Sequence, residues 1–301
     1  MKNLEITTSQ IAKICGVSQG TVDRALNNRA DIKAETKQKI LEVARKYGYR
    51  EIVSTQPGKI VGQIGIVVFN LNNEFFSELI TETEYVLREE GFGAVVMMSH
   101  YDKQREIECI RNLYNMGVKG IILCSVNNGA EFENYLKLFD IPIVAVGNRV
   151  KSLPYVGVDD FSAMKEMTEK VLSDSPENVV YFSPALNYSD AEAQRRRYEG
   201  FLSAVGSKKH SVITELDDIK ERYTEKTTVI CSNDYYALQV YFKTSGAKIV
   251  GFDNIKALDK YKLSIDSVEY SMCEVARCAV DVIKTNKKEN VIIKHSIAKK
   301  D

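Results

Sequence analysis

One stretch near the start of the chain has residue types that can read DNA bases. Residues 10–27 read Gln-Ile-Ala-Lys-Ile-Cys-Gly-Val-Ser-Gln-Gly-Thr-Val-Asp-Arg-Ala-Leu-Asn. A helix-turn-helix needs a small residue at the turn, apolar residues that lock two helices, and polar residues that face the major groove. The stretch has all three, although any two helices joined by Gly-Val can share this pattern.

Each position in this stretch has an expected role. Gly16 forms the turn and Ser18 caps the second helix. The residues expected to lock the two helices are Ala12, Val17, Val22 and Leu26. Arg24 can pair bidentately with guanine. The candidate DNA-contacting residues are Thr7, Ser18, Gln19, Gly20, Thr21, Arg24 and Asn27.

A second set of polar and aromatic residues follows predicted strands later in the chain. Binding clefts of open α/β domains form at the carboxyl ends of strands, so these residues are candidates for contact with a small ligand. They are Asn70, Phe75, Phe76, Asn148, Arg149, Asn233 and Asp253. The rings of Phe75 and Phe76 can stack on a sugar face, but both residues can equally begin a core helix.

Helical and strand patterns divide the chain into a head, a linker and a body. Residues 1–50 contain no strand-like run, and their apolar spacing predicts three short helices. Residues 51–59 are polar and interrupted by Pro57-Gly58, which predicts a linker. From residue 60 to residue 301, short apolar runs alternate with amphipathic stretches, which predicts βαβ units and parallel sheets.

The body contains more predicted strands than one compact sheet usually holds, so we expect two α/β lobes. A break near 158–161 is expected to divide the body in half. The predicted strands are 61–69, 94–98, 120–124, 143–146, 179–182, 228–231 and 248–252. The predicted helices are 75–90, 105–116, 191–205 and 272–285.

Composition and charge agree with this division and exclude several classes of protein. The 301 residues are 44% hydrophobic and 27% charged, values typical of globular proteins. Residues 1–60 carry 11 basic and 6 acidic residues, a net charge of +5. The remaining residues carry 30 basic and 35 acidic residues, a net charge of −5, so the net charge of zero hides two parts of opposite sign. A basic head suggests a polyanion partner. The chain lacks an apolar signal or membrane span, and its six scattered cysteines suggest a reducing cytoplasm.

The head and body together resemble the LacI/GalR family of lac-repressor-like proteins, from about residue 6 to residue 286. The residues that carry the resemblance in the head are Ile11-Ala12, Gly16-Val17-Ser18, Thr21-Val22, Arg24, Leu26-Asn27, Thr36 and Tyr47-Gly48-Tyr49. The resemblance implies an all-α helix-turn-helix head and a periplasmic-binding-protein-like α/β body with two parallel-sheet lobes. It also implies a homodimer that binds double-stranded operator DNA and a small effector.

The resemblance also assigns residues to the effector site. The segment 195–201 resembles the family's Arg-x-x-Gly-Phe, in which the arginine reaches the effector, and this implies that role for Arg197. Asn233 and Asp253 match family positions, and their amide and carboxylate groups suit paired hydrogen bonds to a diol. Tyr270 stands where relatives often have Gln. Asp159-Asp160 resembles a pair at the lobe crossing, where capping of a helix is an equal alternative.

Three departures from the family pattern affect these expectations. Asp23 replaces a usual serine and places a carboxylate near DNA phosphates. Pro57 and Gly58 would disrupt the family's hinge helix, so we expect no standard hinge helix and weaker operator bending. The stretch 206–227 is shorter than usual, which predicts a trimmed second lobe.

No pattern in the sequence supports an enzyme, a metal site or a cofactor. The three histidines, His100, His210 and His295, lie far apart without Cys, Asp or Glu at metal-ligand spacing. A phosphate-binding loop is absent, and Gly62-Gln-Ile-Gly65 lies inside a strand pattern.

These observations predict a cytoplasmic, sequence-specific transcriptional regulator. The resemblance implies a repressor controlled by a sugar or sugar derivative bound between two lobes. The alternative is a solute receptor whose basic head is a non-specific or protein-contact module.

Overall fold

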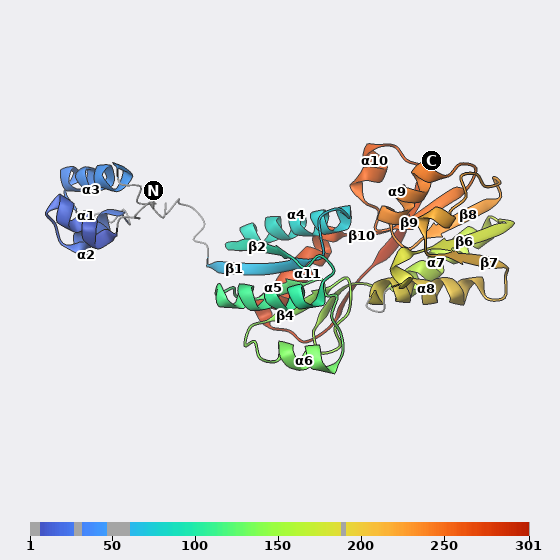
Figure 1. Cartoon of the computed structure of the whole chain (residues 1–301), viewed down its shortest axis with the longest axis horizontal. Coiled ribbons are helices and arrows are strands. Elements are labelled where there is room, and N and C mark those ends of the chain that lie inside the picture. The colour runs from blue at the N-terminus through green and yellow to red at the C-terminus, as the bar shows by residue number, and fades with distance from the viewer. Residues whose placement is uncertain (1–6, 27–31, 47–60, 188–190, 301) are drawn as a thin grey trace. The chain divides into compact units, whose positions relative to one another are not determined.

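A computed structural model describes residues 7–26, 32–46, 61–187 and 191–300. The chain forms two compact units, Met1–Lys59 and Ile60–Asp301 (Figure 1). Within the described ranges, no helix combines the length and the apolar character that crossing a membrane requires. The predicted linker at 51–59 lies outside the described residues.

Three helices form the first unit: α1 (Thr8–Cys15), α2 (Gln19–Leu26) and α3 (Ala34–Lys46). Thr7 caps α1 in a capping box, because its Oγ1 accepts from the Gln10 N–H at 3.3 Å and Gln10 Oε1 accepts from the Thr7 N–H at 2.8 Å. Gly16 ends α1 with φ of 70°, a left-handed conformation that favours glycine. The three helices pack around the buried side chains of Ile11, Ala12, Cys15, Val22, Ala25, Ile40 and Ala44.

The locking residues expected in this unit differ in burial. Ala12 and Val22 lie in its core, whereas Val17 and Leu26 are only partly buried and pack against it. Ser18 caps the start of α2, since the Thr21 N–H donates to Ser18 Oγ at 3.2 Å. The turn and the caps that the sequence predicts are therefore present.

The second unit has two lobes, each built around a six-stranded sheet. Lobe 1 has the order β11-β5-β4-β3-β1-β2 and lobe 2 the order β12-β10-β9-β8-β6-β7. The strands of lobe 1 are β1 (Gly62–Val68), β2 (Phe92–Met98), β3 (Ile121–Leu123), β4 (Ile143–Val146), β5 (Tyr155–Val158) and β11 (Val291–Ile293). Those of lobe 2 are β6 (Asn178–Phe182), β7 (His210–Ile213), β8 (Thr227–Cys231), β9 (Lys248–Phe252), β10 (Ile265–Tyr270) and β12 (His295–Ala298).

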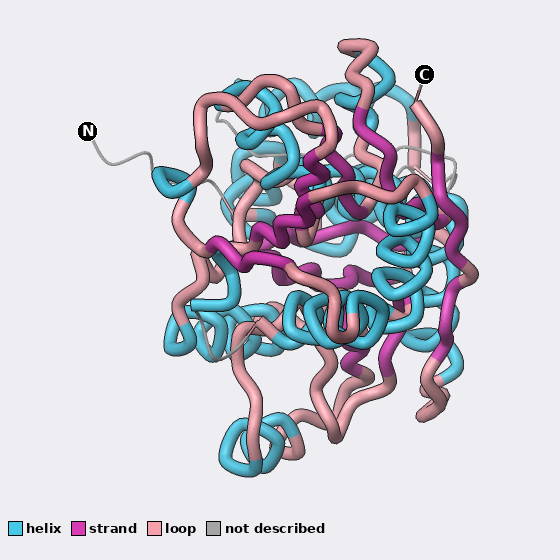
Figure 2. The backbone as a smooth tube through the Cα atoms, turned by 90° about the vertical axis from the view of Figure 1, so that its right-hand side faces the viewer, coloured by secondary structure: helices cyan, strands magenta, loops and turns pink. Residues whose placement is uncertain are grey.

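Helices flank both lobes, and Figure 2 shows strands enclosed by helices. Lobe 1 has α4 (Glu74–Glu89), α5 (Lys103–Asn115), α6 (Ala130–Leu136) and α11 (Met272–Thr285). Lobe 2 has α7 (Asp160–Ser173), α8 (Glu192–Val205), α9 (Asp234–Lys243) and α10 (Lys256–Lys260), with a 3-10 turn at Pro184–Asn187.

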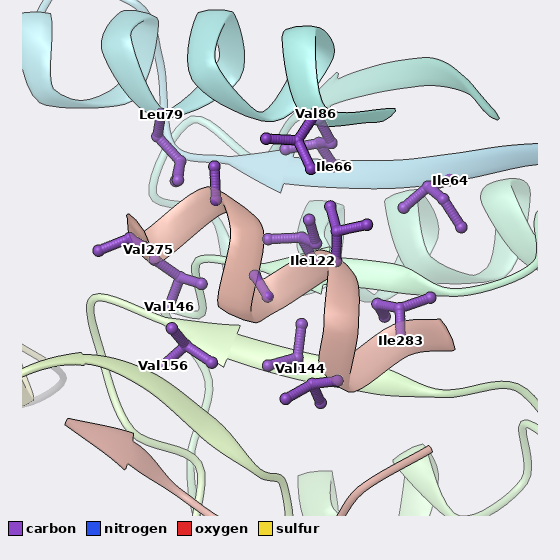
Figure 3. Close-up of a cluster of buried hydrophobic side chains, with 14 of the residues drawn as sticks. Ile64, Ile66, Leu79, Val86, Ile122, Val144, Val146, Val156, Val275 and Ile283 are labelled. Atoms are coloured by element: carbon purple, nitrogen blue, oxygen red, sulfur yellow. The ribbon is translucent and has the colours of Figure 1, made fainter. Parts of the chain in front are cut away.

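Each sheet of the body is buried on both faces, which is why its strands read as continuous apolar runs. In β1, Ile64 and Ile66 join one core with α4 and α11, whereas Val67 joins a second core with α5. Figure 3 shows the first of these cores, with Val275 and Ile283 of α11 among side chains from the strands. The alternation follows from the period of two along a strand.

The expected division of the body at 158–161 is correct for the first crossing but incomplete. The chain passes from β5 to α7 there, returns to lobe 1 after β10 to form α11 and β11, and crosses again to form β12 in lobe 2. Strand β12 runs antiparallel to β10, so the sheet of lobe 2 is parallel except at this edge. Between β7 and β8, a fully described stretch, the only helical segment is a 3-10 turn at Leu216–Asp218.

Candidate functional site

Polar residues at the start of α2 form hydrogen bonds with one another and with α1. Ser18 Oγ lies 2.9 Å from Thr21 Oγ1, and Gln19 Nε2 donates to Thr8 Oγ1 of α1 at 3.0 Å. Arg24 Nε donates to the Gly20 carbonyl at 3.1 Å. Ser18, Gln19 and Gly20 are exposed, and Thr21 and Arg24 are half-buried. The structure thus pre-orders most of the predicted DNA-contacting set, whereas Asn27 lies outside the described residues.

Two adjoining cavities lie between the lobes at the carboxyl ends of the strands. Their empty space, including the part open to solvent, is about 280 and 400 Å³, and they share Phe75, Val146, Gly147 and Arg197 in their walls. Lobe 1 contributes Phe75 and the residues after β4, and lobe 2 contributes Arg197 from α8. Residues from both lobes therefore meet at this cleft, as expected for strand ends in open α/β folds.

Arg197 is the most heavily bonded side chain in the cleft, and it is only 6% exposed. Its Nε donates to Asp160 Oδ1 at 2.8 Å, Nη1 to the Ser232 carbonyl at 2.8 Å, and Nη2 to Asp253 Oδ1 at 3.4 Å. Its guanidinium carbon lies 3.6 Å from the centre of the Phe252 ring. Two carboxylates, a carbonyl and an aromatic face thus hold a rigid cation in the wall.

Asp253 and Tyr270 form the second polar group of the cleft. The Tyr270 hydroxyl donates to Asp253 Oδ1 at 2.9 Å. Burial raises the pKa of Asp253 to about 6, and the charge of Arg197 opposes this rise. Asp253 has φ of 104°, which is strained for a residue with a side chain. The strained backbone follows β9 directly and turns the carboxyl group toward Arg197.

Asn148 joins the two lobes at one side of the cleft. Its Nδ2 donates to the Ser125 carbonyl at 2.9 Å in lobe 1, and its Oδ1 accepts from the Ala193 N–H of α8 at 3.0 Å. Beside it, the Arg149 N–H donates to Glu192 Oε2 at 3.1 Å. Ala191, at the start of α8, provides no side-chain cap, so a residue of lobe 1 caps this helix of lobe 2.

A matching contact between the lobes involves α4 and α10. The N–H groups of Lys256 and Ala257 donate to Glu78 Oε1 at 2.9 Å and Glu74 Oε2 at 3.2 Å. Ile255 provides no side-chain cap for α10. Burial raises the pKa of Glu78, opposed by its bond to Lys256. Two helices of lobe 2 are therefore capped by side chains of lobe 1.

The predicted aromatic pair separates into two environments. Phe75 lines both cavities, while Phe76 is 6% exposed and packs edge-on against Phe69 with ring centres 5.0 Å apart. Asn73 Oδ1 accepts from the Phe75 N–H at 3.1 Å and caps α4. Phe75 thus faces the cleft, and Phe76 belongs to the core while touching the second cavity.

Most other predicted ligand residues also line the cavities, but two do not. Those in the walls are Asn148, Arg197, Asn233, Asp253 and Tyr270. Asn233 also caps α9, accepting from the Tyr236 N–H at 2.9 Å. Asn70 instead accepts from the Asn72 N–H at 2.9 Å, and Arg149 lies 4.1 Å from the centre of the Tyr155 ring, outside both cavities.

Of the two expected roles of Asp159-Asp160, Asp159 has the helix cap and Asp160 has the place in the cleft. Asp159 caps α7, accepting from the Ser162 N–H, and the next residue, Asp160, lines the first cavity and binds Arg197. Gln194 also lines the second cavity, and its Oε1 is buried without a hydrogen-bond partner among the described residues. Gln194 stands three residues before Arg197, a spacing that places both on one helix face and could have identified it.

Within the described ranges, no group of three or more His, Cys, Asp or Glu side chains is arranged to hold a metal ion.

The geometry defines a two-lobed α/β receptor attached to a helix-turn-helix head, and comparison with known proteins identifies the family. The chain belongs to the LacI family. A family described as periplasmic binding proteins and sugar binding domain of LacI family matches residues 61–247, and bacterial regulatory proteins of the lacI family match residues 7–51. The resemblance stated from the sequence is therefore confirmed, and the family is one of regulators, as predicted.

Named relatives extend over nearly the whole chain. Catabolite control protein A of Priestia megaterium is 22% identical over 314 residues, covering 96% of this chain and 95% of the relative. The sucrose operon repressor of Pediococcus pentosaceus is 24% identical over 298 residues, covering 91% and 90%.

Solved structures share the fold at low identity. A LacI-family transcriptional regulator from Silicibacter pomeroyi has a TM-score of 0.74 and 19% identity, covering 98% of both chains. The lac repressor dimer bound to operator and the anti-inducer ONPF has a TM-score of 0.70 and 14% identity, also covering 98% of both. The Cra regulator from Pseudomonas putida with fructose 1-phosphate has a TM-score of 0.66 and 13% identity, covering 79% and 98%. These likenesses confirm the predicted fold class.

Proposed function

We propose that this chain is a sequence-specific DNA-binding transcriptional repressor whose operator affinity is controlled by a sugar or sugar derivative. The observation that carries the proposal is a cleft whose walls come from both lobes, in a chain whose head has helix-turn-helix geometry. A repressor and an operator-bound dimer among its relatives support the same function. We place this regulator in the cytoplasm.

The proposed division of labour follows the chain. Residues 1–50 bind operator DNA, residues 51–59 link the units, and residues 60–301 bind the effector and form a homodimer. Two heads then read two half-sites of a near-palindromic operator. The proposed base and phosphate contacts are Thr7, Ser18, Gln19, Gly20, Thr21, Arg24 and Asn27. The proposed effector contacts are the predicted residues that line the cavities: Phe75, Phe76, Asn148, Arg197, Asn233, Asp253 and Tyr270.

In this proposal the effector regulates DNA binding by changing the fraction of molecules whose two lobes are closed on each other. An effector shifts the equilibrium between open and closed lobes only by its difference in affinity for the two states. Asn148 and Glu78 already connect the lobes through helix caps, so a ligand bound between Phe75 and Arg197 adds to an existing contact surface. Closure then alters the spacing of the two heads in the dimer.

Selection from a random duplex-DNA pool at a stated salt concentration tests the proposal directly. We expect enrichment of a two-fold-symmetric motif by the full chain. Binding without enrichment that disappears as salt rises would favour the alternative, a solute receptor with a non-specific basic head. A gel-phasing assay on the selected site then tests the expectation of weak bending, because bending that depends on residues 51–58 would contradict it.

A further inference from the structure

The charge of the cleft restricts the chemistry of its ligand. Arg197 is the only Lys, Arg or His among the described residues that line either cavity, and two carboxylates, Asp160 and Asp253, bind it. The cavity walls thus hold more negative than positive charge.

Arg197 cannot easily change partners. Each of its three nitrogens donates to an oxygen of the protein, and one face of its guanidinium lies against Phe252. Two of its five N–H groups remain for a ligand, which suits hydroxyl oxygens. An anionic ligand would have to share this one cation with Asp160 and Asp253, and would add a third negative charge to a buried group, which is strongly unfavourable. Arg149 lies over the Tyr155 ring outside both cavities, and its backbone N–H donates to the carboxylate of Glu192.

The same walls offer hydrogen-bonding groups that suit hydroxyls. Gln194 has a buried side-chain amide oxygen without a partner among the described residues, and such an atom is costly unless a ligand satisfies it. Both hydrogen bonds to Asp253 reach Oδ1, so Oδ2 remains for a ligand. Asn233 uses its Oδ1 to cap α9, and its amide N–H groups remain as donors. A hydroxyl both donates and accepts, so it can pair with each of these groups.

We propose that the effector is a polyhydroxylated molecule without a phosphate or carboxylate group, and that Gln194 binds one of its hydroxyls. This inference rests on the proposed function. It separates this chain from a fold relative solved with fructose 1-phosphate, and it adds a specificity-determining residue on α8.

Matched pairs of probes test the charge rule by calorimetry on the full chain at neutral pH. The pairs are fructose and fructose 1-phosphate, glucose and glucose 6-phosphate, and adenosine and its 5′-monophosphate. In any pair that binds, we expect the unphosphorylated member to bind at least about 100-fold more tightly, because like-charge contacts cost several kcal/mol. Tighter binding of a phosphorylated member overturns the inference.

Inorganic phosphate provides a test that needs no organic ligand. We expect millimolar phosphate to leave the melting temperature unchanged relative to chloride at equal ionic strength. A saturable increase in the melting temperature that persists when duplex DNA saturates the head would mean that the cleft accepts anions, and would overturn the inference.

Gln194→Leu tests the proposed hydroxyl contact, with Gln104→Leu on the exposed part of α5 as the matched control. We expect Gln194→Leu to lower the affinity for the probe that binds by about 10-fold or more, because a hydroxyl of the probe loses its hydrogen-bond partner. In the ligand-free protein the same substitution should keep or raise the melting temperature, since it removes an unsatisfied buried atom. A lowered melting temperature, or unchanged probe affinity, would contradict the assignment.

Operator DNA separates failure of this inference from failure of the proposed function. If an unphosphorylated probe binds but leaves operator affinity unchanged, the proposed regulation is wrong and the ligand inference stands. If a phosphorylated sugar changes operator affinity through this cleft, the regulation stands and the ligand inference is wrong.

Discussion

Replacing Arg197 with methionine should destabilise the body far more than replacing an exposed residue that only contacts ligand would. The change leaves Asp160 and Asp253, both nearly inaccessible, without their cation. Breaking a buried ion pair from one side costs about 3–5 kcal/mol. At about 2–4 °C per kcal/mol for a unit of this size, the melting temperature should fall by roughly 6–20 °C.

A second variant distinguishes an unpaired charge from lost packing. Asp160→Asn combined with Arg197→Met removes one of the stranded carboxylates, so the double variant should be more stable than Arg197→Met by at least about 1 kcal/mol. Urea unfolding followed by far-ultraviolet circular dichroism is the suitable assay, because the chain contains no tryptophan. An Arg197→Met variant within about 0.5 kcal/mol of wild type, or strictly additive losses, would refute this account of the cleft.

Four further substitutions test other parts of the molecule. Arg24→Ala should cost about 1–3 kcal/mol on the selected operator with little effect on non-specific DNA, and equal losses on both would assign Arg24 to phosphate. Gly200→Ala places a Cβ 2.2 Å from the Phe161 carbonyl, so separation of α7 and α8 should cost about 1–3 kcal/mol in urea unfolding. The pKa of Asp253 is about 6 in the folded protein and 3.8 in the unfolded chain, so protonation of Asp253 favours folding. This contribution to stability is complete below pH 3.8 and is lost as the pH rises through 6. Effector affinity should fall below pH 6, where Asp253 becomes protonated, and Asp253→Asn should remove the pH dependence of both the stability and the effector affinity. Asn148→Ala should enlarge the radius of gyration of the ligand-free protein, because α8 loses its cap from lobe 1; an unchanged radius would argue against that cap.

Much of the fold follows from local patterns in the sequence. Strand β4 at Ile143–Val146 and helix α11 at Met272–Thr285 have the predicted bounds, because buried parallel strands and amphipathic helices carry strong periodic signals. Strands β5, β7, β10, β11 and β12 were not predicted. They are short or half-exposed, and β11 and β12 are separated only by Lys294. Strand β11 also pairs with β5, which lies far away in the chain, with Val291 opposite Val156, and local patterns cannot specify such a pairing.

The site is predictable to a similar extent. Position after a strand correctly brought Asn148, Asn233 and Asp253 to the cleft, because the parallel topology gathers strand ends. It could not exclude Arg149, whose backbone reaches α8 while its side chain turns to Tyr155. Nor could position after a strand identify Gln194, because this residue lies within α8, and only its spacing from Arg197 points to the cleft.

The crossing of the chain between lobes sets an order for folding during synthesis. The core of lobe 1 includes Val275, Ile283 and Ile293, which the ribosome adds after all of β6 to β10. Lobe 2 is nearly contiguous from α7 to β10, so it can bury its sheet while lobe 1 still lacks α11 and β11. The same separation in sequence delays lobe 1 when the complete chain refolds, because α11 and β11 must close a long loop, so pulsed hydrogen exchange should protect β6 and β8 before β1 and β3. The part of the body that is made first would be the last to become stable, and until then the apolar faces of its strands would stay exposed.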